Sequence, residues 1–193
     1  MKRVLILFTL SLLLLSLSAC NEENTLAETE LSEREQVLIS SVSDQSFVFD
    51  FQTGEEYKQI TIWVDKYEFG ELVDEKISEM TTDIEHNGTI IFTNSPIPDE
   101  QNETIFTIIV SSDKGSSSSR VVQKLKSTEQ STWGSNPMEN IPLEETATLA
   151  SISYANGHGM SSLSSDFYTD LDKHLNEIKE YDVVYVLKSK FHK

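Results

Sequence analysis

The chain has 193 residues, with 32 Asp and Glu against 15 Lys and Arg, and its formal net charge is −17. This charge argues against nucleic acid as a partner, because phosphates are neutralised by Lys and Arg side chains. The length favours one domain behind a targeting segment. A single cysteine excludes a disulfide within the chain, so packing alone must hold the domain together.

The start of the chain has the order of residues typical of an export signal. Two basic residues precede a mostly apolar run over 4–17, and small residues follow that run. A transmembrane anchor is the alternative, but a spanning helix needs about 20 apolar residues. Glu22 and Glu23 arrive before that length is reached. We therefore expect residues 1–19 to be a cleaved signal peptide.

The apolar run ends in Leu17-Ser18-Ala19-Cys20, and Cys20 is the only cysteine of the chain. This sequence resembles the lipobox of bacterial lipoproteins. The resemblance implies that Cys20 carries a diacylglyceryl group with fatty-acyl chains such as palmitate, which hold the mature protein on the extracytoplasmic face of the cell membrane. Two acyl chains suffice for stable anchoring, whereas one binds only marginally. Asn21 follows the cysteine instead of the aspartate that retains Gram-negative lipoproteins, and the composition favours a Gram-positive source.

The segment behind the cysteine is polar and acidic. Such a composition buries too little apolar surface to order a chain, so we expect a lipidated acidic tether over 20–36 and a single β-rich domain over 37–193. Within this region, Ser32 and Glu35 have the spacing of a capping box for a short helix through residues 37–39.

Alternation of apolar and polar residues predicts most of the domain to be strands. Phe47, Phe49 and Phe51 share one face of a half-buried strand, and the apolar run over 105–110 predicts a central strand. Asn87-Gly88 predicts a hairpin turn, and the serines at 116–119 are expected in a loop. Further strands are expected over 60–64, 72–77, 81–86, 89–93, 120–126, 146–154 and 183–187.

One helix is expected late in the chain. Phe167, Leu171, Leu175 and Ile178 have helical spacing and form an apolar stripe, and Ser165 can cap the helix. Short strands separated by turns, with one helix among them, predict a mainly β fold. We expect an antiparallel β-sandwich-like domain with one C-terminal amphipathic helix; an α+β fold is the alternative.

Five residues are candidates for binding: Trp63, Trp133, His158, Asp170 and His174. Trp63 lies on the polar face of its strand, and Trp133 lies in an expected loop over 127–142. Aromatic side chains so placed can anchor a partner, although packing under the helix explains Trp63 better. His158 lies in a glycine-flanked loop beside serines. Asp170 and His174 are four residues apart on the expected helix, a spacing that supplies half a metal site at most.

Motifs for catalysis or metal binding are absent from the sequence. It contains no paired cysteines, no H-E-x-x-H and no G-x-S-x-G. The acidic run over 99–103 lacks the spacing of a calcium-binding loop. We therefore expect no catalytic residue, no metal and no cofactor.

These observations favour a membrane-anchored, non-enzymatic binding or accessory module. Its expected partners are the lipid membrane, through Cys20, and a protein, a glycan or a cation as ligand. Two alternatives remain open. One is a cell-envelope hydrolase that uses His158 or His174, and the other is a structural subunit of a membrane complex.

Overall fold

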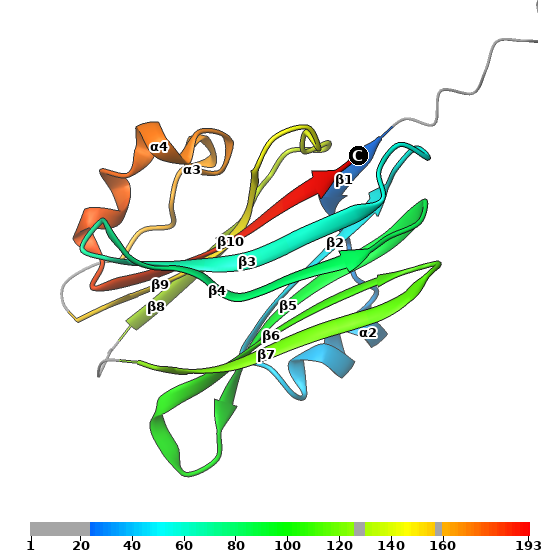
Figure 1. The fold of residues 1–193 in the computed structure, drawn as a ribbon. Coiled ribbons are helices and arrows are strands. Elements are labelled where there is room, and N and C mark those ends of the chain that lie inside the picture. The colour runs from blue at the N-terminus through cyan, green and yellow to red at the C-terminus, as the bar shows by residue number, and fades with distance from the viewer. Residues whose placement is uncertain (1–23, 126–129, 157–159) are drawn as a thin grey trace, which may run out of the picture.

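Ten strands form two antiparallel sheets in the computed structural model, which describes residues 24–125, 130–156 and 160–193. The sheets pack face to face (Figure 1), which confirms the predicted β-sandwich-like fold. In order across the sheet, the first contains β1 (Thr25–Glu28), β2 (Gln45–Gln52), β5 (Asn87–Ile97), β6 (Glu100–Ser112) and β7 (Gly115–Lys124). The second contains β4 (Glu71–Asp83), β3 (Gln59–Glu68), β10 (Val183–His192), β9 (Ala147–Ala155) and β8 (Gln130–Ser135).

Aromatic side chains fill the space between the two sheets. Phe47, Phe49 and Phe51 all point inward from β2, as their alternation predicts. Phe106 of the first sheet meets Tyr185 of the second edge to face, with ring centroids 4.7 Å apart. This geometry suits the ring quadrupoles, and it joins β6, the predicted central strand, to β10.

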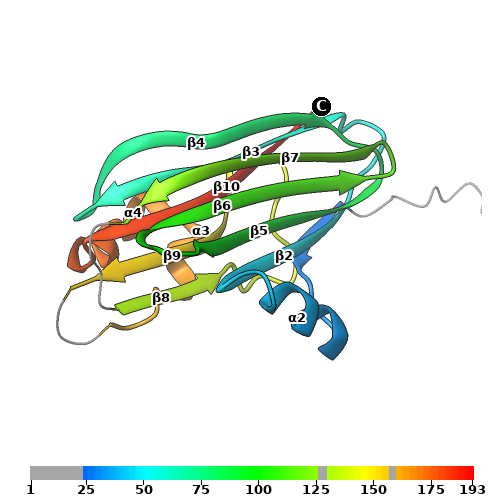
Figure 2. The ribbon, with the colours of Figure 1, turned by 90° about the horizontal axis from the view of Figure 1, so that it is seen from below.

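The sheets also meet along one side, where β4 and β7 run next to each other (Figure 2). The Ser78 and Ser119 hydroxyls lie 2.7 Å apart, and so do those of Thr82 and Ser117. Residues 116–119 therefore belong to β7 and not to the expected loop. Alternate serines of this run lie in the seam, where hydroxyl pairs link two strands that share no backbone ladder.

The segment expected as a tether is structured from residue 25 onward. Leu26 is fully buried and pairs with Phe51 of β2 in the β1–β2 register. The backbone N–H of Ile141 donates to the Leu26 carbonyl at 2.7 Å. One buried leucine and backbone partners on both sides thus order β1, although the acidic composition of the segment predicted no regular structure there. The domain begins at β1, and the expected boundary at residue 37 is replaced by one near residue 25.

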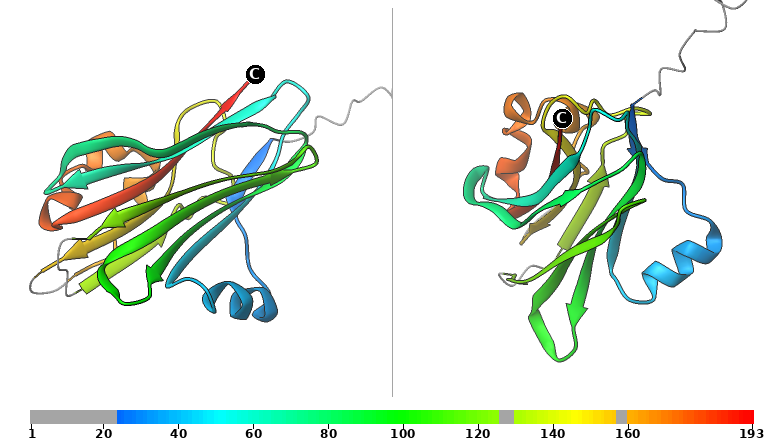
Figure 3. Two further views of the ribbon diagram at one scale, coloured as in Figure 1. Left: turned by 60° about the horizontal axis from the view of Figure 1, so that its bottom comes forward. Right: turned by 45° about the vertical axis from the view of Figure 1, so that its right-hand side comes forward.

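The helix that follows β1 is α2 (Glu33–Ser40), and its predicted capping box is present. The Ser32 hydroxyl accepts from the N–H of Glu35, and the Glu35 carboxylate accepts from the N–H of Ser32 at 2.9 Å. None of the residues of α2 is buried. Figure 3 shows the helix standing away from both sheets, so its local capping holds it more than packing does.

Asn87-Gly88 does not form the predicted hairpin turn. Both residues belong to β5, which pairs with β2 and β6, whereas β4 pairs with β3 in the other sheet. The glycine is required by packing instead. A Cβ at Gly88 would lie 2.2 Å from a ring carbon of Phe51 and 2.4 Å from the carbonyl oxygen of Ser111.

The single amphipathic helix predicted after residue 164 is broken into three short pieces. These are α3 (Ser165–Thr169), α4 (Leu171–His174) and a 3-10 turn, η1 (Glu177–Glu180). The break lies at Asp170, whose φ of −149° and ψ of 73° are not helical. Its carboxylate instead accepts from the N–H of Lys173 and caps α4, while Ser164, not Ser165, caps α3.

The apolar stripe survives this break. Phe167, Leu171 and Ile178 are buried and pack with Val184 and Val186 on the outer face of the second sheet. The three pieces therefore cover that face (Figure 1). Among the described residues, no helix is both long enough and apolar enough to cross a membrane.

Candidate functional site

Two residues singled out from the sequence, Cys20 and His158, lie outside the described residues. The structure places the two tryptophans on different faces of the second sheet. Trp63 is only 7% exposed and lies on the outer face of β3, where the Lys76 ammonium is 5.7 Å from its ring centroid. Trp133 is 53% exposed. It belongs to the edge strand β8 and not to a loop, and it sits opposite Ile152, which faces the core.

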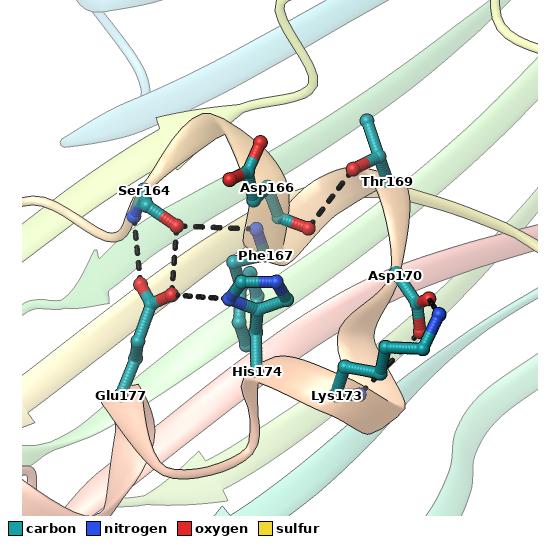
Figure 4. A network of polar contacts seen from close by, with 8 residues as sticks. All are labelled: Ser164, Asp166, Phe167, Thr169, Asp170, Lys173, His174 and Glu177. Atoms are coloured by element: carbon teal, nitrogen blue, oxygen red, sulfur yellow. Dashed lines mark hydrogen bonds and ion pairs between the residues drawn. The ribbon is translucent and has the colours of Figure 1, made fainter.

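His174 belongs to a polar network centred on Glu177 (Figure 4). Its Nδ1 lies 2.8 Å from Glu177 Oε1, and the Ser164 hydroxyl donates to the same oxygen at 2.7 Å. The Ser164 N–H donates to Oε2 at 2.9 Å. Partial burial acts to raise the pKa of Glu177, but the hydrogen bonds from Ser164 and His174 outweigh it and hold that pKa below its ordinary value.

This arrangement differs from that of a hydrolase in one respect. Nucleophilic catalysis needs a base in contact with the nucleophile, and a third group that orients the base. Here the carboxylate of Glu177 lies between Ser164 and His174 and accepts from both (Figure 4). The bonds tie η1 to the start of α3, so the network fixes the helical cover over the sheet.

Asp170 and His174 are not brought together. Asp170 accepts from the Lys173 ammonium at 2.5 Å, and this hydrogen bond lowers the pKa of the carboxyl group. His174 turns to Glu177 instead. Within residues 24–125, 130–156 and 160–193, no group of three or more His, Cys, Asp or Glu side chains is placed to hold a metal ion.

A cavity of about 450 Å³ opens between this helical cover and the segment that joins β8 to β9. Its wall is apolar where Met138, Ile141 and Leu171 line it. Its charged lining residues are three acids and one base: Glu145, Asp170, Asp172 and Lys188. An apolar wall with a few convergent charged groups is typical of binding sites for small ligands.

Lys188 is held from behind by a buried ion pair. Its ammonium lies 2.9 Å from Asp65 Oδ2, and the two side chains are only 15% and 8% exposed. The Lys188 ammonium also donates to the hydroxyl of Tyr67 at 3.4 Å. The second oxygen of Asp65 accepts from the N–H of Lys76 at 3.0 Å. Both charges are thus satisfied on the outer face of β3 and β10.

The ion pair determines the protonation state of Lys188. Burial acts to lower the pKa of Lys188, but Tyr67 and Asp65 outweigh it and hold the pKa above its ordinary value. Burial also raises the pKa of Tyr67. A protonated lysine and a neutral tyrosine can donate hydrogen bonds at neutral pH, but neither can act as a base or nucleophile.

Sequence reasoning missed Lys188, Asp65 and Tyr67. The signal was a charged residue directly after an apolar run in each of two strands, Asp65 after residues 60–64 and Lys188 after residues 183–187. Buried charges are expected to be paired. Sequence does not show that β3 and β10 are neighbours, and the pairing depends on that contact.

A second hollow, of about 700 Å³, lies on the outer face of the first sheet. Its lining is mostly small and polar, and Asp50 accepts from the Thr89 hydroxyl there at 2.6 Å. The acids that line it, Asp50 included, are exposed to solvent. The cavity above Lys188 is therefore the stronger candidate, because it alone of the two is lined by a charged group, Lys188, that the fold largely removes from water.

Comparison with known proteins gives one finding. The model of a family described as the YgaN domain matches residues 25–191, a range that starts at β1 and ends within β10. No curated protein and no solved structure matches the chain. Because the match covers the whole sandwich, the chain belongs to the YgaN domain family.

Proposed function

We propose that this protein is a lipoprotein anchored through Cys20 to the extracytoplasmic face of the cell membrane, and that its sandwich is a binding module without catalytic activity. The lipobox-like sequence before Cys20 supports the anchor. The observation that carries the binding role is the cavity of about 450 Å³ beside the Lys188–Asp65 ion pair. The ion pair with Asp65 holds the Lys188 ammonium in a fixed position beside the cavity.

The polar groups of the cavity and of the helical cover beside it favour binding over chemistry. Lys188 is protonated and already paired. His174 and Ser164 each bond to Glu177 and not to each other. A hydrolase would need one of these groups to be a free base in contact with a nucleophile.

Of the three expected kinds of ligand, the cavity favours a cationic group. Glu145, Asp170 and Asp172 line it. The charge of Lys188 is neutralised by Asp65, and that of Asp170 by Lys173, which leaves Glu145 and Asp172 to meet a cation. The apolar wall suits a hydrocarbon stem, so an organic amine fits better than a bare metal ion. Lysine side chains of a protein partner and polyamines both have this chemistry. The net charge of −17 would also attract cations over a longer range.

Calorimetric titration with spermidine and with a lysine-rich peptide tests this proposal. We expect saturable binding that weakens as salt is raised, because salt screens exposed charges. The double variant Glu145→Gln/Asp172→Asn should lose most of this binding. Asp166→Asn/Glu180→Gln is the matched control, since both residues are exposed acids of the same helical cover that do not line the cavity. Equal affinity in both variants would show that any binding is only a general effect of acidity.

The anchor has a separate test. Metabolic labelling with an alkyne fatty acid should mark the wild-type protein and leave Cys20→Ala unlabelled. The variant should also leave the membrane fraction. An unlabelled wild-type protein would refute the anchor without affecting the cavity.

A further inference from the structure

The end of the sandwich where the described chain begins is fixed to the domain. Asn24 Oδ1 accepts from the N–H of Gly54 at 2.8 Å, and the Asn24 amide donates to Glu56 at 3.4 Å. Both partners lie in the loop between β2 and β3. Asn24 is therefore part of the folded end, and β1 begins one residue later.

Cys20 is only four residues before Asn24. A chain extends by at most about 3.6 Å per residue, so these four residues span no more than about 14 Å. If Cys20 is lipidated, the link between the lipid and the domain is therefore much shorter than the tether over 20–36 that the acidic composition predicted. The end of the domain around Asn24 must then lie close to the lipid headgroups, whatever path residues 21–23 take.

Three lysines gather at this same end. Lys58 and Lys114 line a cavity of about 270 Å³ together with Tyr57. The Lys193 ammonium lies 5.0 Å from the centroid of the Tyr57 ring. Figure 1 shows the end of β10 near the start of β1, which agrees with the Lys58 N–H donating to the His192 carbonyl at 2.8 Å.

Acidic side chains accompany the lysines at this end. Glu55, Glu56 and Glu85 lie among them, and Asp113 directly precedes Lys114. An anionic membrane surface attracts Lys and repels acids. The lysines are therefore the groups of this end that can contact anionic headgroups, and the short link to a lipidated Cys20 would keep them near the bilayer.

From these observations we propose that the protein sits end-on upon the bilayer. Lys58, Lys114 and Lys193 face the phosphates of anionic headgroups, and the turn between β3 and β4 faces away. The ten residues of β3 separate the two ends by about 33 Å. This orientation rests on the proposed lipid anchor and adds the surface that meets the membrane.

The proposal can be tested with single thiol probes, because lipidation leaves the mature wild-type chain without a free cysteine. Glu55→Cys places a probe at the membrane end, and Glu71→Cys is its match at the other end. Both residues are exposed acids. A fluorophore on each is followed in the full lipidated protein on phosphatidylglycerol vesicles that carry a nitroxide on the headgroup. We expect strong quenching at position 55 and little at position 71.

Equal quenching at both positions would overturn the proposal, because the domain would then lie flat, and absence of quenching at both would show that it is held away from the bilayer. Adding Lys58→Gln/Lys114→Gln should reduce quenching at position 55, whereas Lys124→Gln/Lys173→Gln should not. If the lysine pair makes no difference, the headgroup contact is refuted. Flotation of the same samples distinguishes these outcomes from failure of the anchor, since an unanchored protein would not float with the vesicles.

Discussion

Removing the charge of Lys188 should destabilise the protein strongly. Lys188→Met keeps a side chain of similar length but leaves the Asp65 carboxylate, only 8% exposed, with the N–H of Lys76 as its remaining partner. Breaking a buried ion pair from one side costs about 3–5 kcal/mol. For a domain of this size, each kcal/mol lowers Tm by about 2–4 °C, so we expect a loss of roughly 10 °C.

The complementary changes separate the ion pair from general packing. Asp65→Asn should also destabilise, because it leaves a buried ammonium without its counter-charge. The double variant Asp65→Leu/Lys188→Met removes both charges, and buried ion pairs can often be replaced by apolar residues at little cost. We therefore expect the double variant to be more stable than either single variant, which gives a measurable coupling in a double-mutant cycle.

Urea unfolding followed by tryptophan fluorescence and circular dichroism measures these free energies. Because the pKa of Lys188 is raised in the folded state, its contribution is fully present below the pKa of the unfolded chain, about 10.4. It is lost as the pH rises through the folded value. The difference in the free energy of unfolding between wild type and Lys188→Met should thus become smaller at high pH. A cost below about 1 kcal/mol at neutral pH, the level of exposed pairs, would refute the buried pair.

Three further predictions concern the fold. Gly88→Ala should cost about 1–3 kcal/mol in urea unfolding, because its Cβ would overlap the Phe51 ring. Ser32→Ala removes the cap of α2, which is worth about 1 kcal/mol; since none of α2 is buried, hydrogen exchange should rise in residues 33–40 with little change in Tm. Burial raises the pKa of Tyr154 to about 12. The stability that its neutral hydroxyl contributes should be fully present below about pH 10 and lost as the pH rises towards 12. Tyrosinate absorbance, with Tyr154→Phe as the control, follows this ionisation.

The parts of the fold that sequence predicted well are those set by local alternation. Phe47, Phe49 and Phe51 alternate with less apolar residues, and period two puts them on one face wherever the strand pairs. The capping box of Ser32 and Glu35 is likewise complete within four residues. Neither feature depends on which strands are neighbours, so both could be found without the structure.

The errors arise where distant partners overrule a local signal. Asn87-Gly88 favours a hairpin between the strands on either side of it, but those strands, β4 and β5, belong to different sheets. Trp133 was expected in a loop because Gly134, Pro137 and Pro142 follow it, yet pairing with β9 makes its segment a strand. The Lys188–Asp65 pair joins strands that are far apart in the sequence, so neither its partner nor its burial could be inferred from either strand alone.

Asp170 connects the local sequence pattern with the contacts that form in the folded domain. The stripe of Phe167, Leu171 and Ile178 was correct about which side chains are buried, but a continuous helix does not follow from it. Asp170 leaves the helix, caps α4 and pairs with Lys173, which is exposed. The same residue lines the cavity that contains Lys188. A continuous helix would keep Asp170 in the helical ladder, whereas at the break its carboxylate caps α4 beside the cavity. The break in the helix and the place of Asp170 in the cavity lining therefore have one cause.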